Sequence, residues 1–389
     1  MIPYVRYIDR ASCVCRNHYV EWVYISLMMT EIAAYSGWLG NNNIGDEALY
    51  LANEKIFADF ELVNRDYYDD SLIQLYGGGT VLPRQAIEHG SDELVAAIGV
   101  GVEDPDFRNQ PFASIDIEYY LEKNDIAFLI GNKYTQHIAN QIASLSDSVM
   151  MDRKYVTEDR YTPVQRFDYL GVRGPRSKEI LSRYGIDSQV VGDTALLLEP
   201  SEYNHQKSNR VAVTLRSAKS VLKWTDDTEY IQVIEKFCRE HSDEYEFVFL
   251  PFRPIDIPLH AKLSKKIPNA EFRDYCSHVD VRAAIDEISD CDIVIGERLH
   301  ASILAACSFT PFVSLGYQPK NDDFVESINM TEYHTRFHQL TINWLVDRFE
   351  KIRTSDDARQ KLQAEVTDKR AEIQSLAKEI TTAINEQDY

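Results

Sequence analysis

Short apolar runs, many of them ending at a glycine or a charged residue, recur along the chain and alternate with stretches whose apolar residues return every three or four positions. The short runs have the length and composition of buried parallel strands, and the spaced stretches have the periodicity of helices. Strands are predicted at Ile32–Tyr35, Leu72–Tyr76, Leu94–Val100, Tyr169–Arg173, within Val190–Leu198, and at Val211–Leu215, Phe247–Leu250, Ala270–Arg273, Ile293–Ile295 and Phe312–Leu315. This alternation predicts an α/β fold built on parallel sheets with right-handed crossovers.

The polar segment Pro200–Asn209 interrupts this alternation, and we place a domain boundary there. The expected units are an N-terminal domain over residues 30–204, a C-terminal domain over 205–340, and amphipathic helices over 341–389 that pack on the body. The pattern is less regular between Phe112 and Phe167, where helices are predicted around Glu118–Lys123 and Tyr134–Leu145.

Residues 1–29 precede the first predicted strand and contain a mostly apolar run after three arginines. A signal peptide and an upstream extension are the two interpretations. We favour the extension, with Met28 or Met29 as the functional start, because the first core strand follows without a spacer after any cleavage point.

The charge balance restricts the classes of ligand. The 389 residues include 62 acidic and 41 basic side chains, which give a formal net charge of −21. Such a chain lacks the basic face of a nucleic-acid-binding protein, so no nucleic-acid partner is expected. An anionic ligand would need a local cationic pocket on an acidic body. The six cysteines are scattered without zinc-type spacing, so we expect a reducing compartment and no structural metal.

Cationic side chains follow the two strands of the predicted strand–helix–strand unit between residues 293 and 320. Arg298 and His300 come directly after the first strand, and Lys320 follows the second in an expected loop. Ligands of open parallel sheets bind at the carboxyl ends of the strands, where helix N-termini also favour anions. The alternative is that Arg298 pairs with Glu297 or Asp292 and that His300 only caps the helix. Three cations at the strand ends of one unit favour an anion site.

Other strand exits carry further candidates. Arg173 and Arg176 flank a predicted helix start, and Arg216 ends the first strand of the second half. A Gly- and Asn-rich loop from Gly37 to Gly45 leads into a helix near Asp46, which by spacing alone would be a helix cap. The glycines of residues 77–79 are typical of a tight strand-to-helix turn that a ligand can approach.

Taken together, these motifs resemble the polysaccharide pyruvyl transferase family. The matching segments, in order from about Glu31 to Asn329, are GNNNIGDEA at Gly40–Ala48, YGGGT at Tyr76–Thr80, AIGVGVE at Ala97–Glu103, GVRGPRS at Gly171–Ser177, VVGDTALLL at Val190–Leu198, and ERLHA followed by YQPK between Glu297 and Lys320. ERLHA followed by YQPK is the most specific of these motifs. The N-terminal extension is unmatched, and the final helices match only loosely.

The resemblance implies two Rossmann-like domains that face a central cleft, as in GT-B glycosyltransferases. It implies phosphoenolpyruvate as the donor and a sugar acceptor whose two hydroxyls become bridged as a pyruvate ketal. The residues that match the family's donor-binding positions are Arg173, Arg298, Leu299, His300 and Lys320. Asp46 would be the general base or proton shuttle, and His300 the general acid to the leaving group. Asn43, Gly78, Arg176 and Arg216 are additional candidates.

No cofactor beyond phosphoenolpyruvate as co-substrate is expected, and no metal, because arginines can stabilise the charge. The partners expected are a glycan or lipid-linked saccharide, the latter with peripheral membrane association, and a second copy of the chain in a homo-oligomer. A cytoplasmic location is expected. The alternatives are a glycosyltransferase of the same architecture with a nucleotide-sugar donor and a non-catalytic glycan-binding relative.

Overall fold

The computed structural model describes residues 31–67, 71–90, 92–105, 158–203, 207–217 and 228–386. The predicted extension over residues 1–29 and the helices predicted around Glu118–Lys123 and Tyr134–Leu145 lie outside these residues.

The first domain is organised around a seven-stranded sheet whose strands pair in parallel. Its order is β2-β1-β3-β5-β6-β7, with β4 paired to β5. The strands are β1 (Glu31–Ser36), β2 (Phe60–Asn64), β3 (Ile73–Gly77), β4 (Thr80–Leu82), β5 (Leu94–Val102), β6 (Tyr169–Val172) and β7 (Gln189–Val190). The helices are α2 (Ile44–Ile56) and α6 (Pro175–Arg183), with 3-10 turns at Glu158–Tyr161, Pro163–Arg166 and Thr194–Leu197. Every residue of β5 is buried, as expected of a central parallel strand with both faces covered.

The second domain repeats this construction with a six-stranded parallel sheet in the order β10-β9-β8-β11-β12-β13. The strands are β8 (Arg210–Thr214), β9 (Glu246–Phe249), β10 (Ala270–Phe272), β11 (Ile293–Gly296), β12 (Phe312–Gly316) and β13 (His334–Arg336). The helices are α7 (Thr228–Glu240), α8 (Ile257–Lys266), α9 (Val281–Ser289), α10 (Leu299–Cys307) and α11 (Pro319–Ser327), with 3-10 turns at Pro254–Asp256, Thr331–Tyr333 and Phe337–Gln339. The predicted α/β class with two parallel-sheet domains is confirmed.

Several local predictions were wrong. Strands β2 and β13 were missed because both are short and carry polar residues at the sheet margins. Within Val190–Leu198 the chain leaves the sheet at Val190 and continues into a 3-10 turn. The glycines after β3 lead into strand β4 and not into a helix.

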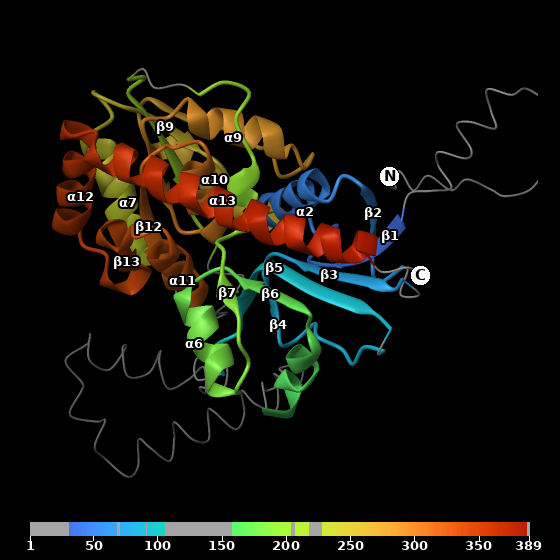
Figure 1. Cartoon of the computed structure of the whole chain (residues 1–389). Helices are drawn as coiled ribbons and strands as arrows, with labels where there is room; N and C mark the ends of the chain where they lie inside the picture. The colour runs from blue at the N-terminus through green and yellow to red at the C-terminus, as the bar shows by residue number, and fades with distance from the viewer. Residues whose placement is uncertain are drawn as a thin grey trace, which may run out of the picture.

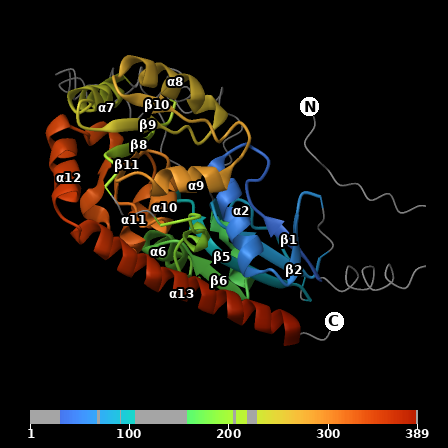
Figure 2. The ribbon, with the colours of Figure 1, turned by 90° about the horizontal axis from the view of Figure 1, so that it is seen from above.

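The C-terminal helices α12 (Ile342–Thr354) and α13 (Asp357–Glu386) join the two domains. Figures 1 and 2 show α13 running from the second domain along the side of the first. Arg370 of α13 donates hydrogen bonds to the carbonyl of Leu196 at 2.6 Å and to that of Cys307 at 2.8 Å, one in each domain. Farther along α13, Leu376 packs on Gly171 of β6, which leaves no room for a side chain there. These contacts fix the two sheets relative to each other.

Candidate active site

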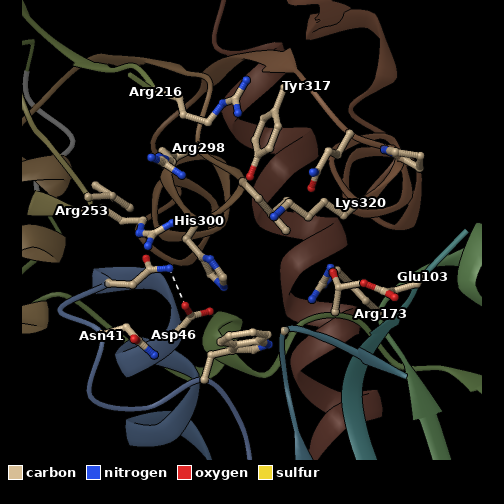
Figure 3. A pocket seen from close by; sticks show the side chains of 18 of the residues that line it. Asn41, Asp46, Glu103, Arg173, Arg216, Arg253, Arg298, His300, Tyr317 and Lys320 are labelled. Atoms are coloured by element: carbon tan, nitrogen blue, oxygen red, sulfur yellow. Dashed lines mark hydrogen bonds between the residues drawn. The ribbon is translucent and has the colours of Figure 1, made fainter. Parts of the chain in front are cut away.

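The carboxyl ends of the two sheets border one pocket of about 380 Å³ (Figure 3). Its lining includes Asn43, Asp46, Arg173, Arg216, Arg298, Leu299, His300 and Lys320, all predicted from the sequence. It also includes residues that were not predicted, namely Trp38, Asn41, Gly79, Thr80, Arg84, Val102, Glu103, Asp104, Phe252, Arg253, Tyr317, Gln318 and Pro319. Residues from both halves of the chain therefore form a single site.

On the second domain's wall, four neighbouring strands are each followed by a cation. Arg253 follows β9, Arg216 follows β8, Arg298 follows β11, and Lys320 follows β12. These strands lie side by side in the sheet order, so the cations form a row along its carboxyl edge. Lys320 lies in the first turn of α11 and not in a loop as predicted. Arg253 was missed, although the rule that selected Arg216 from its strand exit applies to it equally.

Two arginines of this row are held by buried carboxylates. Arg298 donates from Nε and Nη2 to the two carboxylate oxygens of Asp256, at 2.9 and 2.7 Å. The alternative that Arg298 pairs with Glu297 or Asp292 was therefore wrong in its choice of partner. Glu297 instead accepts from the backbone N–H of Arg216 at 2.7 Å and from its Nε at 3.3 Å. The two-pronged pair with Asp256 fixes the guanidinium of Arg298 before any ligand arrives, and the single bond from Nε to Glu297 orients that of Arg216.

Arg173 is the buried cation of the first domain, with no exposed surface. Its Nε donates to Asp193 at 2.8 Å, whereas Nη1 and Nη2 have no hydrogen-bond acceptor. Gly101 packs against this guanidinium, since a Cβ at that position would lie 2.8 Å from Nη1. Each buried donor that is left without an acceptor costs about 1–3 kcal/mol of folding free energy. A bound anion at the pocket wall would satisfy them.

His300 lies at the second position of α10, where Arg298 and not His300 is the N-cap. Its ring packs on the backbone of Gly45 from the other domain, and its Nε2 has no partner. Burial lowers the pKa of His300 well below its ordinary value, and the positive charges of Arg173 and Lys320 lower it further. The imidazole is thus neutral at pH 7 in the absence of an anion.

Asp46 faces this cationic wall from α2 (Figure 3). The N-cap is Asn43, whose side chain accepts from the N–H of Gly45 and donates to Asp46, and Asp46 lies in the first turn of α2, where its charge suits the helix N-terminus as the alternative held. Burial raises the pKa of Asp46 from 3.8 to about 6, against the opposing charges of Lys320 and Arg253. A carboxyl with a pKa near neutrality can accept and return a proton at physiological pH.

Tyr317 was missed and lies between two of the cations. Its ring centre is 4.3 Å from the guanidinium carbon of Arg216 and 5.0 Å from Nζ of Lys320. Burial favours the neutral phenol, but the charges of Lys320 and Arg298 outweigh it and lower the pKa of Tyr317. No sequence motif outside the YQPK segment indicates this residue.

Two predicted residues lie away from the pocket lining. Arg176 pairs across the domain boundary with Asp322 at 3.2 Å and with Glu326 at 2.6 Å. Gly78 packs on the side chain of Leu49 in a left-handed conformation, with φ of 74°, and its neighbour Gly79 lines the pocket instead. Arg176 therefore holds the domains together, and Gly78 supports the turn after β3.

Within the residues that the structure describes, no group of three or more His, Cys, Asp or Glu side chains is placed to hold a metal ion. Among the described helices, none combines the length and the apolar composition needed to cross a bilayer.

Two parallel-sheet α/β domains that face a shared pocket, with C-terminal helices that join them, define a fold of the GT-B class. Residues 164–319 match the polysaccharide pyruvyl transferase family, which confirms the resemblance over this part of the chain. The matched range contains Arg173, Arg216, Arg298 and His300; Asp46 and Lys320 lie outside it.

One solved structure is similar enough in fold to support this class, and two others are more distant. The glycotransferase of kitacinnamycin has a TM-score of 0.51 and 12% sequence identity, over 91% of this chain and 99% of that chain. The calicheamicin glycosyltransferase has a TM-score of 0.46 and 11% identity, over 93% of this chain and 100% of that one. In the accessory secretory proteins 1, 2 and 3 of Streptococcus pneumoniae, the similar region covers 58% of this chain and 46% of that chain, with a TM-score of 0.39 and 10% identity. A comparison with curated protein sequences gives no match.

Proposed function

We propose that the protein transfers the enolpyruvyl group of phosphoenolpyruvate to two hydroxyls of a glycan sugar and forms a pyruvate ketal. The observation that carries the proposal is the buried guanidinium of Arg173, whose two Nη groups lack acceptors at the wall of a pocket that also holds Arg216, Arg253, Arg298 and Lys320. A small ligand with a phosphate and a carboxylate supplies the acceptors that this cluster lacks. The family match over residues 164–319 supports the same donor.

The cations on both domains have complementary parts in donor binding. The guanidinium of Arg298 is held by two hydrogen bonds to Asp256 and that of Arg216 by one to Glu297, so they bind an anion with little loss of side-chain entropy. The positive charges of Arg173, on the first domain, and Lys320, on the second, both lower the pKa of His300, so both act on the same imidazole. When phosphate binds there, its charge offsets theirs and raises the pKa of His300. The imidazole can then protonate the departing phosphate.

Asp46 is the base on the acceptor side. With a pKa of about 6, it is mostly ionised at pH 7 and can take the proton of an attacking hydroxyl. In the reaction, the methylene carbon of the donor gains a proton, the first hydroxyl attacks the adjacent carbon, and phosphate leaves. The second hydroxyl then closes the ketal and releases its proton. The carbon-bound proton comes from Asp46 or His300, the two titratable groups that meet at the domain boundary.

A second candidate is a glycosyltransferase with a nucleotide-sugar donor, which the fold likeness to the glycotransferase of kitacinnamycin favours. The two candidates differ in their ligand. Titration calorimetry with phosphoenolpyruvate, UDP and UDP-sugars separates them, because the proposed cluster of cations binds the small phosphoenolpyruvate anion without a nucleoside. Binding and turnover of a nucleotide sugar, with phosphoenolpyruvate left intact by every acceptor, would overturn the proposal.

The direct test incubates the protein with phosphoenolpyruvate and a panel of glycans, and follows phosphate release together with the mass gain of a ketal-linked pyruvate. Arg298→Ala is the negative control, because it removes a fixed pocket cation. Arg183→Ala is the matched control, since Arg183 pairs with Glu179 on the surface of α6, away from the pocket.

We further place the reaction in the cytoplasm, with a glycan or its lipid-linked precursor as acceptor and peripheral membrane association in the lipid-linked case. Phosphoenolpyruvate is the co-substrate, and no resident cofactor or metal is proposed. A homo-oligomer remains an expectation from the sequence alone.

A further inference from the structure

The two walls of the pocket differ in chemistry. The wall of the second domain carries the row of cations, whereas that of the first carries an indole, an amide and carboxyl groups beside Arg173 and Arg84. The residues concerned are Trp38, Asn41, Asp46, Glu103 and Asp104. Carboxylates repel a phosphate but accept hydrogen bonds from hydroxyls. Away from Arg173 and Arg84, the first domain's wall therefore suits a neutral, hydroxyl-rich ligand.

Trp38 is the unusual member of this wall. Its side chain is 45% exposed, although burying an indole is strongly favourable. Six large hydrophobic side chains are exposed in the part of the chain that the structure describes, and among these Trp38 alone lines the pocket. The indole lies over the turn after β3, because a Cβ on Gly79 would be 3.8 Å from its Cδ1. A solvent-facing aromatic plane is thus placed inside the pocket.

The loop that carries Trp38 is tied to the helix that carries Asp46. The backbone N–H of Gly40 donates to Oε1 of Glu47 at 2.9 Å, and Glu47 directly follows Asp46 in the first turn of α2. This hydrogen bond holds the loop, two residues beyond Trp38, against the first turn of α2 beside Asp46. A ring that packs on Trp38 presents its edge substituents to the pocket that Asp46 also lines.

We propose that Trp38 is the acceptor platform: the apolar C–H face of a pyranose ring stacks on its indole, and the hydroxyls at the ring edge point to Asp46 and the amide of Asn41. The inference rests on the proposed function, because it assigns the acceptor half of the same pocket. It states that the acceptor is a sugar ring with one unsubstituted apolar face. Aromatic rings favour such packing through their large, rigid contact area.

The experiment compares Trp38→Ala and Trp38→Phe with Tyr67→Ala, since Tyr67 is 86% exposed and lies outside the pocket lining. Calorimetry measures phosphoenolpyruvate binding, and steady-state kinetics measures the KM for the acceptor. We expect Trp38→Ala to raise the acceptor KM by about 10-fold or more, the size of effect that one aromatic contact gives. Trp38→Phe should recover part of this loss, and the Kd for phosphoenolpyruvate should stay within about twofold. Tyr67→Ala should change neither quantity.

A binding readout keeps the inference separate from the proposed function. The glycan panel is titrated into wild type and Trp38→Phe, and the quench of intrinsic fluorescence that is lost in the variant reports stacking on Trp38. A glycan that gives this quench, while no glycan supports phosphate release, would sustain the platform and overturn the transferase proposal. Normal ketal formation by Trp38→Ala, with an unchanged acceptor KM and no Trp38-dependent quench, would overturn the platform alone. A change in the Kd for phosphoenolpyruvate as large as that in the acceptor KM would also overturn it.

Discussion

The imidazole of His300 lies directly on the backbone of Gly45, so that a side chain at position 45 would overlap the ring. Gly45 belongs to α2 of the first domain, and His300 to α10 of the second. The N-terminal turns of these two helices thus meet at the pocket, where both contribute positive potential to a bound anion. Their contact also brings the two titratable groups of the site, Asp46 and His300, to the same domain boundary.

This contact predicts the effect of Gly45→Ala. The added methyl group must displace the His300 ring or separate the domains, so we expect kcat to fall at least 10-fold and the melting temperature to drop by several degrees. In the background of His300→Gly the same substitution should cost little stability, because both the ring and the Cβ of residue 300, which would lie 2.6 Å from the added methyl group, are absent. A double-mutant cycle by thermal denaturation measures this coupling. Equal costs in both backgrounds would contradict the explanation.

Asp46→Asn separates activity from stability. A carboxyl pKa raised from 3.8 to about 6 corresponds to at most about 3 kcal/mol of penalty on the charged form. The stabilisation that protonation provides is complete below about pH 3.8 and is lost as the pH rises through 6. The neutral variant should therefore lose transfer activity yet melt at a higher temperature than wild type at pH 7.5. A lower melting temperature at that pH would contradict the interpretation that burial of the ionised Asp46 carboxylate destabilises the folded protein.

The same pKa predicts the pH–rate profile. If ionised Asp46 is the base, kcat/KM should rise with pH through a midpoint near 6. Measuring phosphate release between pH 5 and 8 under subsaturating donor and acceptor tests this. Asp46→Glu should retain some activity and shift the midpoint, whereas Asp46→Asn should abolish the limb. A profile that is flat across this range would exclude Asp46 as the base.

Anion binding should change the protonation of His300. Without ligand, its lowered pKa keeps the ring neutral in the folded protein. Below about pH 6.5 the imidazole takes up a proton only in the unfolded chain, so the free energy of unfolding decreases as the pH drops. Phosphoenolpyruvate or inorganic phosphate should raise that pKa by offsetting Arg173 and Lys320. NMR titration of the imidazole resonances with and without phosphate, with His300→Gln for assignment, measures the shift. An unchanged pKa on saturation would place the phosphate elsewhere.

Asp323 is predicted to stabilise the contact between α11 of the second domain and α6 of the first domain. Its Oδ1 accepts from the N–H groups of Arg176 and Ser177 at 2.9 and 3.1 Å, and its Oδ2 accepts from the Ser177 hydroxyl at 2.7 Å. This carboxyl of α11 caps α6 across the domain boundary, and α11 also carries Lys320. Asp323→Ala should destabilise the protein by about 1–3 kcal/mol and weaken donor binding, whereas Asp323→Asn should keep much of both. Calorimetry and small-angle scattering of the two variants report binding and domain separation. Wild-type donor affinity in Asp323→Ala would rule out this role.

The sequence alone determined the class of fold and several of the pocket's cations, because both depend on local patterns. Apolar runs that end at glycine or arginine located most of the strands, and the rule that ligands meet the carboxyl ends of parallel strands selected Arg173, Arg216 and Arg298. Arg253 follows the same rule and could have been found.

Only the tertiary structure could decide which groups meet across the domains. Nothing local shows that Asp256 pairs with Arg298, that Arg176 turns to α11, or that Gly45 receives the ring of His300. The raised pKa of Asp46 and the lowered pKa of His300 likewise arise from burial between two domains. Burial and charge at these two groups depend on the packing of segments from both domains, so they cannot be read from neighbouring residues in the chain.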